Sequence, residues 1–333
     1  MEITSVLQNL KKGIYHPIYL LQGDESYYID AISDYIEDHV LTDAEKGFNQ
    51  TIFYGKDSDP INIAESARRF PMMADKQVIV VKEAQSLNKI ENLAPYAEKP
   101  LDSTILVLAY KYKTLDGRGK LIKAIKKNGL VFTSKKLYEN QVPGWIDTYL
   151  KERQYTITPQ AAQLLTAYLG TELSKIANEL NKLVIAVKDT NRITPEHIER
   201  NIGVSKDFNL LELQNALGAK DVLKANKIIK YFGANPTLNP IQKTVAGLYF
   251  YFSKLFTYHF LKDKSERSVA AELRVHPFFA KDYITAAKRY SPTKLYEIMG
   301  ILREYDMKSK GFNSSNMVDM ADLQKEMIYK ILH

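Results

Sequence analysis

The feature that most constrains the fold of this chain is a set of apolar runs, within its first 140 residues, that show no polar alternation. The runs are IYLLQG (18–23), VIVV (78–81), TILVLAY (104–110) and LVFT (130–133). Strands buried on both faces of a parallel sheet have this pattern. A helical pattern follows the first run, with one apolar face formed by Tyr28, Ile29, Ile32, Tyr35 and Ile36. The sequence therefore predicts an α/β domain.

Beyond Trp145 the chain has the pattern of helices. Three hydroxyl residues each precede a proline, which caps and opens a helix: Thr158 before Pro159, Thr194 before Pro195, and Ser291 before Pro292. Leucine and isoleucine recur at helical spacing between Leu173 and Leu183. This spacing predicts a compact helical unit over about 145–207.

A second helical region follows the segment GVSKDFN (203–209), which predicts a linker. Breaks in that region are expected at NPTLNP (235–240), HPFF (276–279) and GFNSSN (311–316). Because 333 residues exceed the usual size of one core, we predict three domains. They are an α/β domain over 1–144, a small helical domain over 145–208 and an all-helical domain over 209–333.

The chain contains no cysteine, which excludes disulfides, cysteine-based zinc sites and a thiol nucleophile. A reducing cytosol fits this composition, so a cytoplasmic location is expected. The N-terminus, MEITSVLQNLKKG, has no apolar block of signal-peptide length. The most apolar later stretch, GLYFYFSKLFTYHFL, is interrupted by Lys254 and His259. No membrane span is expected.

Positive charge is concentrated in one segment of the chain, residues 111–136. The net charge of the whole chain is +7, whereas this segment has nine cations against the single acid Asp116. The cations are Lys111, Lys113, Arg118, Lys120, Lys123, Lys126, Lys127, Lys135 and Lys136. Such a block can contact phosphates, form a solvated helix face or meet an acidic protein partner, and the sequence leaves all three open.

An α/β domain followed by a small helical domain can bind a nucleotide, but the sequence lacks the motifs that nucleotide binding needs. After the first strand the chain reads GDESYYID, where a P-loop would need GxxxxGK and a hydroxyl residue. The pairs Gly55–Lys56 and Gly119–Lys120 lack the other P-loop residues. The VIVV strand ends in Lys82 and Glu83, and a lysine there disfavours magnesium. The domain therefore has the pattern of a subunit that functions within a protein complex without using ATP itself.

Other chemistry is also missing from the sequence. The six histidines have no metal spacing and no GxSxG or HExxH motif occurs, so no catalytic residue, metal or cofactor is predicted. His197 and His276 are expected at the surface or in helix caps. A cluster of aromatic residues in the second helical region is expected to pack in a helical core rather than stack on bases. Its members are Tyr249, Phe250, Tyr251, Phe252, Phe256, Tyr258 and Phe260.

The segment RRFPMMADKQVIVV (68–81) joins a helix to a strand through two methionines. Asp59 and Pro60 predict the start of the helix, whose positions Ile63, Ala64, Ala67 and Phe70 are expected to face the sheet. Pro71 blocks continuation of that helix. At least one of Met72 and Met73 is therefore expected to be exposed. A methionine there suits insertion into a partner's pocket, and the alternative is that both plug the domain's own edge.

Five segments, in this order and spacing, resemble the delta subunit of the bacterial DNA polymerase III clamp loader. They are IYLLQGDESYYID, RRFPMMADKQVIVVKEA, KKLYENQVPGWI, LGTELSKIANELNKL with ITPEHIERNIGVS, and FNLLELQNALGAKD. The resemblance implies an ATPase-like (AAA+) parallel-sheet domain without a P-loop, a small helical lid and a C-terminal helical collar. It also implies a subunit with no catalysis of its own, in a complex that has ATPase and DNA polymerase activity.

In that family the corresponding tip inserts an apolar pair into the hydrophobic pocket of the sliding clamp and favours clamp opening. The resemblance thus implies that Met72 and Met73 bind the clamp, supported by Phe70 and Pro71, although relatives often carry a leucine and phenylalanine pair. The collar would hold the chain among the other clamp-loader subunits. Primed DNA within the complex is a further implied partner, with possible contacts at Lys120, Lys123, Lys126, Lys127 and Phe312.

Two other functions stay open from the residues alone. The chain could be an AAA+ ATPase with a divergent site, which nucleotide binding by the isolated chain would favour. It could also be a helical nucleic-acid-binding protein with an α/β head, which tight and steeply salt-dependent DNA binding without a clamp would favour.

Overall fold

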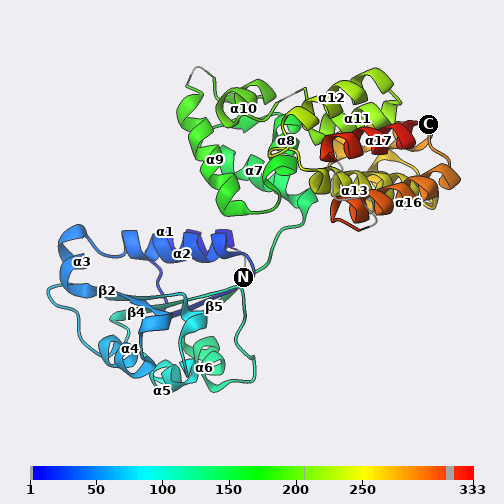
Figure 1. Ribbon diagram of the computed structural model, residues 1–333. Coiled ribbons are helices and arrows are strands. Elements are labelled where there is room, and N and C mark those ends of the chain that lie inside the picture. Colours follow the sequence, from blue (N-terminus) through cyan, green and yellow to red (C-terminus); the bar gives the residue numbers. More distant parts are fainter. Residues whose placement is uncertain (1–2, 189, 206, 313–318) are drawn as a thin grey trace. The chain divides into compact units, whose positions relative to one another are not determined.

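The four apolar runs all lie in one parallel sheet in the computed structural model (Figure 1). The structure describes residues 3–188, 190–205, 207–312 and 319–333, and it divides the chain into two compact units, 1–137 and 138–333. The three domains that the sequence suggested stay a prediction.

The first unit alternates strands and helices. Its strands are β1 (Ile18–Gly23), β2 (Gln50–Tyr54), β3 (Gln77–Lys82), β4 (Thr104–Lys111) and β5 (Leu130–Ser134). Its helices are α1 (Ile3–Lys11), α2 (Ser26–His39), α3 (Asp43–Asn49), α4 (Pro60–Ala67), α5 (Ala94–Glu98) and α6 (Lys120–Asn128). The sheet order is β2-β3-β4-β1-β5. Strand β2 was not predicted; it is an edge strand, and none of its five residues is fully buried.

Two apolar layers enclose the sheet of the first unit. Helices α1 and α2 cover one face, while α4, α5 and α6 cover the other (Figure 1). Neighbouring strand residues point to opposite faces, so Leu20 packs with the second layer and Leu21 with the first. Burial on both faces explains why these strands show no polar alternation.

The second unit is helical, as expected. Its helices are α7 (Val142–Lys151), α8 (Pro159–Leu169), α9 (Leu173–Ala186), α10 (Pro195–Ile202), α11 (Leu210–Ala219), α12 (Val222–Ala234), α13 (Ile241–His259), α14 (Glu266–Glu272), α15 (Ala280–Ala287), α16 (Pro292–Ser309) and α17 (Met320–Leu332). The capping hydroxyls Thr158, Thr194 and Ser291 directly precede α8, α10 and α16. Two short strands, β6 (Thr156–Ile157) and β7 (Arg192–Ile193), were not expected.

The expected interruptions of the second unit are present where the structure describes them. Helix α12 ends before NPTLNP, and a single 3₁₀ turn (Pro277–Phe279) forms within HPFF. Most of GFNSSN lies outside the described residues. His197 belongs to the capping box of α10 and His276 accepts a hydrogen bond from the Phe278 amide, so both are cap residues.

The aromatic cluster of α13 is divided between core and surface, which corrects the expectation that it would simply pack. Tyr251, Phe252 and Tyr258 are buried, whereas Tyr249 and Phe250 are at least half exposed, as is Phe260, which follows the helix. Helix α13 packs on α15 and α16, and its partly exposed Tyr249 and Phe250 line an open surface pocket together with Tyr296 of α16. Among the described residues, no helix has the length and apolarity needed to cross a bilayer, and none of the acidic or histidine clusters could hold a metal ion.

Buried tyrosines make the second unit sensitive to alkali. The Tyr290 hydroxyl donates to the Leu217 carbonyl at 2.6 Å, and burial raises its pKa to about 12; burial also raises the pKa values of Tyr251 and Tyr283. A raised tyrosine pKa contributes stability that is complete below the unfolded pKa of 10.0 and is lost as pH rises through the folded value. We therefore expect the free energy of unfolding to fall between pH 10 and 12. Urea titrations over this range should show a shallower fall in Tyr290→Phe, and an equal slope would contradict the assignment.

Candidate interaction site

Three strongly exposed apolar residues of the first unit lie on the tip, which we define as residues 68–76 between α4 and β3. Phe70 is 76% exposed, Met72 is 62% exposed and Met73 is fully exposed. The prediction that at least one methionine is exposed is confirmed, and the alternative that both plug the domain's own edge is wrong. Phe70 was expected to face the sheet; it does not, because α4 ends at Ala67 and the chain turns away before it. Pro71 is half-buried.

The side-chain amide of Asn49 holds the backbone of the tip. Asn49 is the last residue of α3 and is 4% exposed. Its Oδ1 accepts a hydrogen bond from the Met72 amide at 2.7 Å, and its Nδ2 donates to the Met72 carbonyl at 2.9 Å. Both polar groups of Met72 are therefore satisfied by one buried side chain, which fixes the backbone beneath the exposed methionines.

The other end of the tip is held by two buried polar residues at the start of β3 and β4. The Thr104 hydroxyl donates to the Ala67 carbonyl at 2.9 Å, and Gln77 Nε2 donates to Thr104 Oγ1 at 2.7 Å. Gln77 also donates to the Arg69 carbonyl. Met73 adopts a left-handed backbone conformation with φ of +53°, which is uncommon for a residue with a side chain. A fixed backbone that presents free apolar side chains loses little entropy when a partner binds.

The carboxyl end of β1, where a P-loop would lie, is closed. Only Asp24 and Glu25 separate β1 from α2, and the Glu25 carboxylate accepts a hydrogen bond from the Tyr27 amide at 3.2 Å. Glu25 is buried, and its own amide donates to Ser134 Oγ at 3.1 Å. An acidic side chain therefore lies at the helix N-terminus that would otherwise attract a phosphate.

Ion pairs occupy the neighbouring strand ends. Lys82 Nζ lies 2.9 Å from a Glu37 carboxylate oxygen, and this hydrogen bond raises the pKa of Lys82. Lys111 Nζ lies 2.7 Å from Asp30 and 3.3 Å from Glu83. Burial lowers the pKa of Lys111, but the two acids outweigh burial and the pKa is raised. Carboxylates thus neutralise the lysines at the sheet edge where nucleotides bind in open α/β folds.

The basic block is only partly free of acidic partners. Lys111 is paired as described above, and Arg118 lies 2.8 Å from Asp116. Helix α6 buries its apolar face and exposes Lys120, Lys123, Lys126 and Lys127, for which the structure records no ion pair among the described residues. Phe312, in the second unit, is 61% exposed. These positions have the exposure that a contact with phosphate or a base needs.

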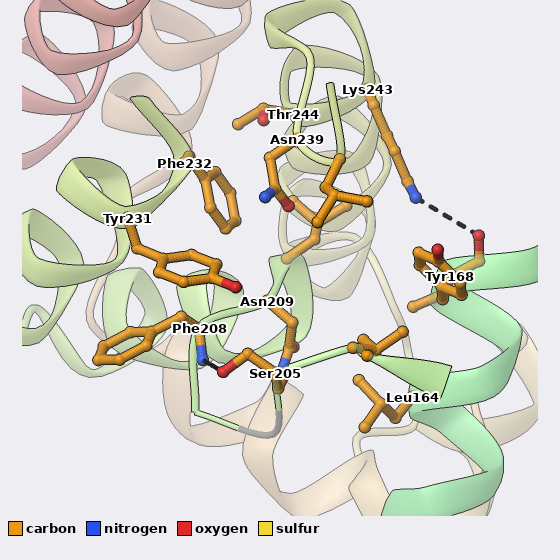
Figure 2. Close-up of a pocket in the computed structure, with 15 residues that line it drawn as sticks. Leu164, Tyr168, Ser205, Phe208, Asn209, Tyr231, Phe232, Asn239, Lys243 and Thr244 are labelled. Atoms are coloured by element: carbon orange, nitrogen blue, oxygen red, sulfur yellow. Dashed lines mark hydrogen bonds between the residues drawn. The ribbon is translucent and has the colours of Figure 1, made fainter. Parts of the chain in front are cut away.

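A pocket in the second unit lies between α8, the segment 203–210 and helices α12 and α13 (Figure 2). The ring of Phe208 stacks on Tyr231 with the centroids 5.2 Å apart, and Lys243 Nζ donates to the Tyr168 carbonyl at 3.4 Å (Figure 2). Burial lowers the pKa of Lys243, which is the only charged residue in the part of the pocket lining that the structure describes. Its described lining contains no acid or histidine, so it offers no acid–base pair for catalysis.

Comparisons with known proteins agree with the sequence resemblance. The family model described as DNA polymerase III, delta subunit, matches residues 19–135. DNA polymerase III subunit delta of Bacillus subtilis (strain 168) is 28% identical, over 97% of this chain and 96% of that protein. The solved structure of the Bacillus subtilis DNA clamp loader delta protein is similar with a TM-score of 0.56 and 25% identity, over 99% of both chains. The fold predicted from the resemblance is confirmed by this structural match.

Proposed function

Because the chain belongs with the delta subunits of the DNA polymerase III clamp loader in sequence and in fold, we propose that it binds the sliding clamp through the tip and favours clamp opening. The opened clamp would then be loaded onto primed DNA during replication. The observation that carries this proposal is the fully exposed Met73 beside Met72, on a backbone fixed by Asn49. Phe70 and Pro71 extend the same apolar surface.

The proposed mechanism is a shift of an equilibrium, with no reaction on this chain. A protein that binds the opened clamp more tightly than the closed ring moves the ring toward opening by that difference in binding free energy. ATP would act on other subunits of the loader. Residues 209–333 would form the collar that contacts those subunits, and the exposed Tyr249, Phe250 and Tyr296 of α13 and α16 are suitable for such contacts.

The proposal is tested by calorimetric titration of the chain into the sliding clamp of the same organism without ATP. A second titration uses a clamp variant with a weakened subunit interface. We expect the chain to bind both clamps. It is expected to bind the variant with the weakened interface more tightly, because opening that clamp costs less free energy. Equal affinity for both clamps would contradict the opening mechanism, and absence of binding to either would contradict the function.

The competing ATPase function predicts that the isolated chain binds nucleotide. We expect no change in thermal unfolding of the chain with Mg-ATP at millimolar concentration, since Glu25 and the paired lysines leave no anion site at the sheet edge. A rise in the unfolding temperature that depends on ATP concentration would contradict this expectation and favour a divergent ATPase.

We further propose that the exposed lysines of α6 contact DNA phosphates within the assembled complex, with Phe312 as a second contact. Replacing Lys123, Lys126 and Lys127 with glutamine is expected to reduce the salt dependence of DNA binding by the assembled loader, because each phosphate contact releases counterions. The matched control is Lys11→Gln, an exposed lysine on α1. An unchanged salt slope would remove α6 from the DNA-binding surface. Tight DNA binding by the isolated chain would instead favour a nucleic-acid-binding protein.

A further inference from the structure

We propose that Phe48 is a further apolar anchor for the sliding clamp, so that the docking surface is built from two chain segments, the tip and the end of α3. This inference rests on the proposed function. Neither the local sequence around Phe48 nor the resemblance singles this residue out. The proposal comes from its exposure and from its place beside Asn49.

Phe48 is as exposed as the residues of the tip. Its side chain is 76% exposed, the same fraction as that of Phe70. The helix that carries it does not need an exposed aromatic ring, because its N-terminus is closed by a capping box in which the Glu45 carboxylate accepts a hydrogen bond from the Thr42 amide at 2.8 Å. A large apolar side chain held in water beside other exposed apolar side chains is typical of an interaction surface.

Strand register places Phe48 and the tip at the same edge of the sheet. Strands β2 and β3 are parallel neighbours, with Gln50 opposite Val78. Phe48 comes two residues before Gln50, and Met73 comes five residues before Val78. Both segments therefore enter neighbouring strands from the same side.

Asn49 joins the two segments directly. Its side chain makes the hydrogen bonds of 2.7 and 2.9 Å to the backbone of Met72 described above, and Nδ2 also lies 3.2 Å from the Glu45 carbonyl of its own helix. The end of α3 and the Met72 backbone are thus fixed to each other by a buried residue. A partner that covers Met72 and Met73 would reach Phe48 without rearrangement of this unit.

The inference is tested by titrating the Phe48→Ala variant of the full chain into the sliding clamp without nucleotide. Loss of one buried aromatic anchor is expected to weaken binding about ten- to a hundredfold. Phe48→Leu keeps most of the apolar area, so its loss of binding free energy is expected to be less than half of the loss in Phe48→Ala. The control is Tyr112→Ala, which removes an aromatic side chain that is 61% exposed after the carboxyl end of β4, at the opposite edge of the sheet. It is expected to bind like the parent.

The same titrations separate this inference from the proposed function. If Met72→Ala with Met73→Ala weakens binding while Phe48→Ala binds like the parent, the inference is wrong and the proposed function stands. If Phe48→Ala and Tyr112→Ala weaken binding equally, the effect is not specific and the inference is also wrong. If the parent does not bind the clamp, both fail together. Equal urea midpoints for parent and variants exclude unfolding as the cause.

Discussion

Replacing Met72 and Met73 together with alanine is expected to weaken clamp binding by about 10²- to 10⁴-fold. Met73 is fully exposed and Met72 is 62% exposed in the free chain, so most of the apolar area of both side chains can be buried against a partner. A buried methionine side chain contributes roughly 1.5–3 kcal/mol. Because neither side chain packs in the core of the first unit, the free energy of unfolding is expected to change by less than about 0.5 kcal/mol.

The measurement is calorimetric titration into the clamp at fixed ionic strength, with urea unfolding of each variant. Ile61→Ala is a matched control, since Ile61 is 56% exposed at the start of α4, away from the tip. The single variants measure how much of the affinity each methionine contributes. Met73→Ala is expected to weaken clamp binding at least as much as Met72→Ala, because Met73 is the more exposed. Parent-like affinity in the double variant would show that the tip is no anchor, and the function would then have to be sought at α6 or in the second unit.

Four of the strands and several helix starts could be predicted because their signals are local. An apolar run without alternation indicates a strand buried on both faces, as in residues 18–23. A hydroxyl residue before a proline indicates a helix cap, as at Thr158. Both signals can be interpreted without knowledge of the rest of the chain. The strand β2 could not be predicted in this way, because an edge strand is covered on one side only and QTIFY carries no clear period.

The candidate site could be predicted only where the signal was a sequence break. Pro71 indicates that the chain turns, and a turn with two methionines indicates exposure. The role of Asn49 could not be found, since its partner Met72 lies 23 residues further along the chain and the pairing exists only after β2 and β3 align. Phe48 was missed for the same reason. Long-range polar contacts of this kind depend on tertiary structure, for which a single sequence has no periodic signal.

Replacing Gly23 with alanine is expected to destabilise the first unit by roughly 2–6 kcal/mol. Gly23 ends β1 with φ of +121°, a conformation that side chains rarely adopt. A Cβ atom there would lie 2.2 Å from the Ser134 carbonyl oxygen and 2.7 Å from Ser134 Oγ. The Gly23 amide and carbonyl also bond to Lys113 and Tyr112, so the backbone has little freedom to move away.

Hydrogen exchange of the β1 and β4 peptides measures this effect within the first unit, and fluorescence of Trp145, the single tryptophan, reports on the second unit as an internal control. Gly117→Ala is the matched substitution, because a Cβ atom at Gly117 meets nothing within 4 Å. In an ATPase, a glycine after the first strand opens a loop around a phosphate; here the glycine is needed because the backbone of β5 lies against it. Hydrogen-exchange protection in Gly23→Ala equal to that of the parent would mean that this edge of the sheet has room to open. That result would favour a divergent nucleotide site. Fast exchange in β1 and β4 alone would mean that the place of the phosphate loop is filled by the protein's own packing, which is what a subunit that acts only by binding requires.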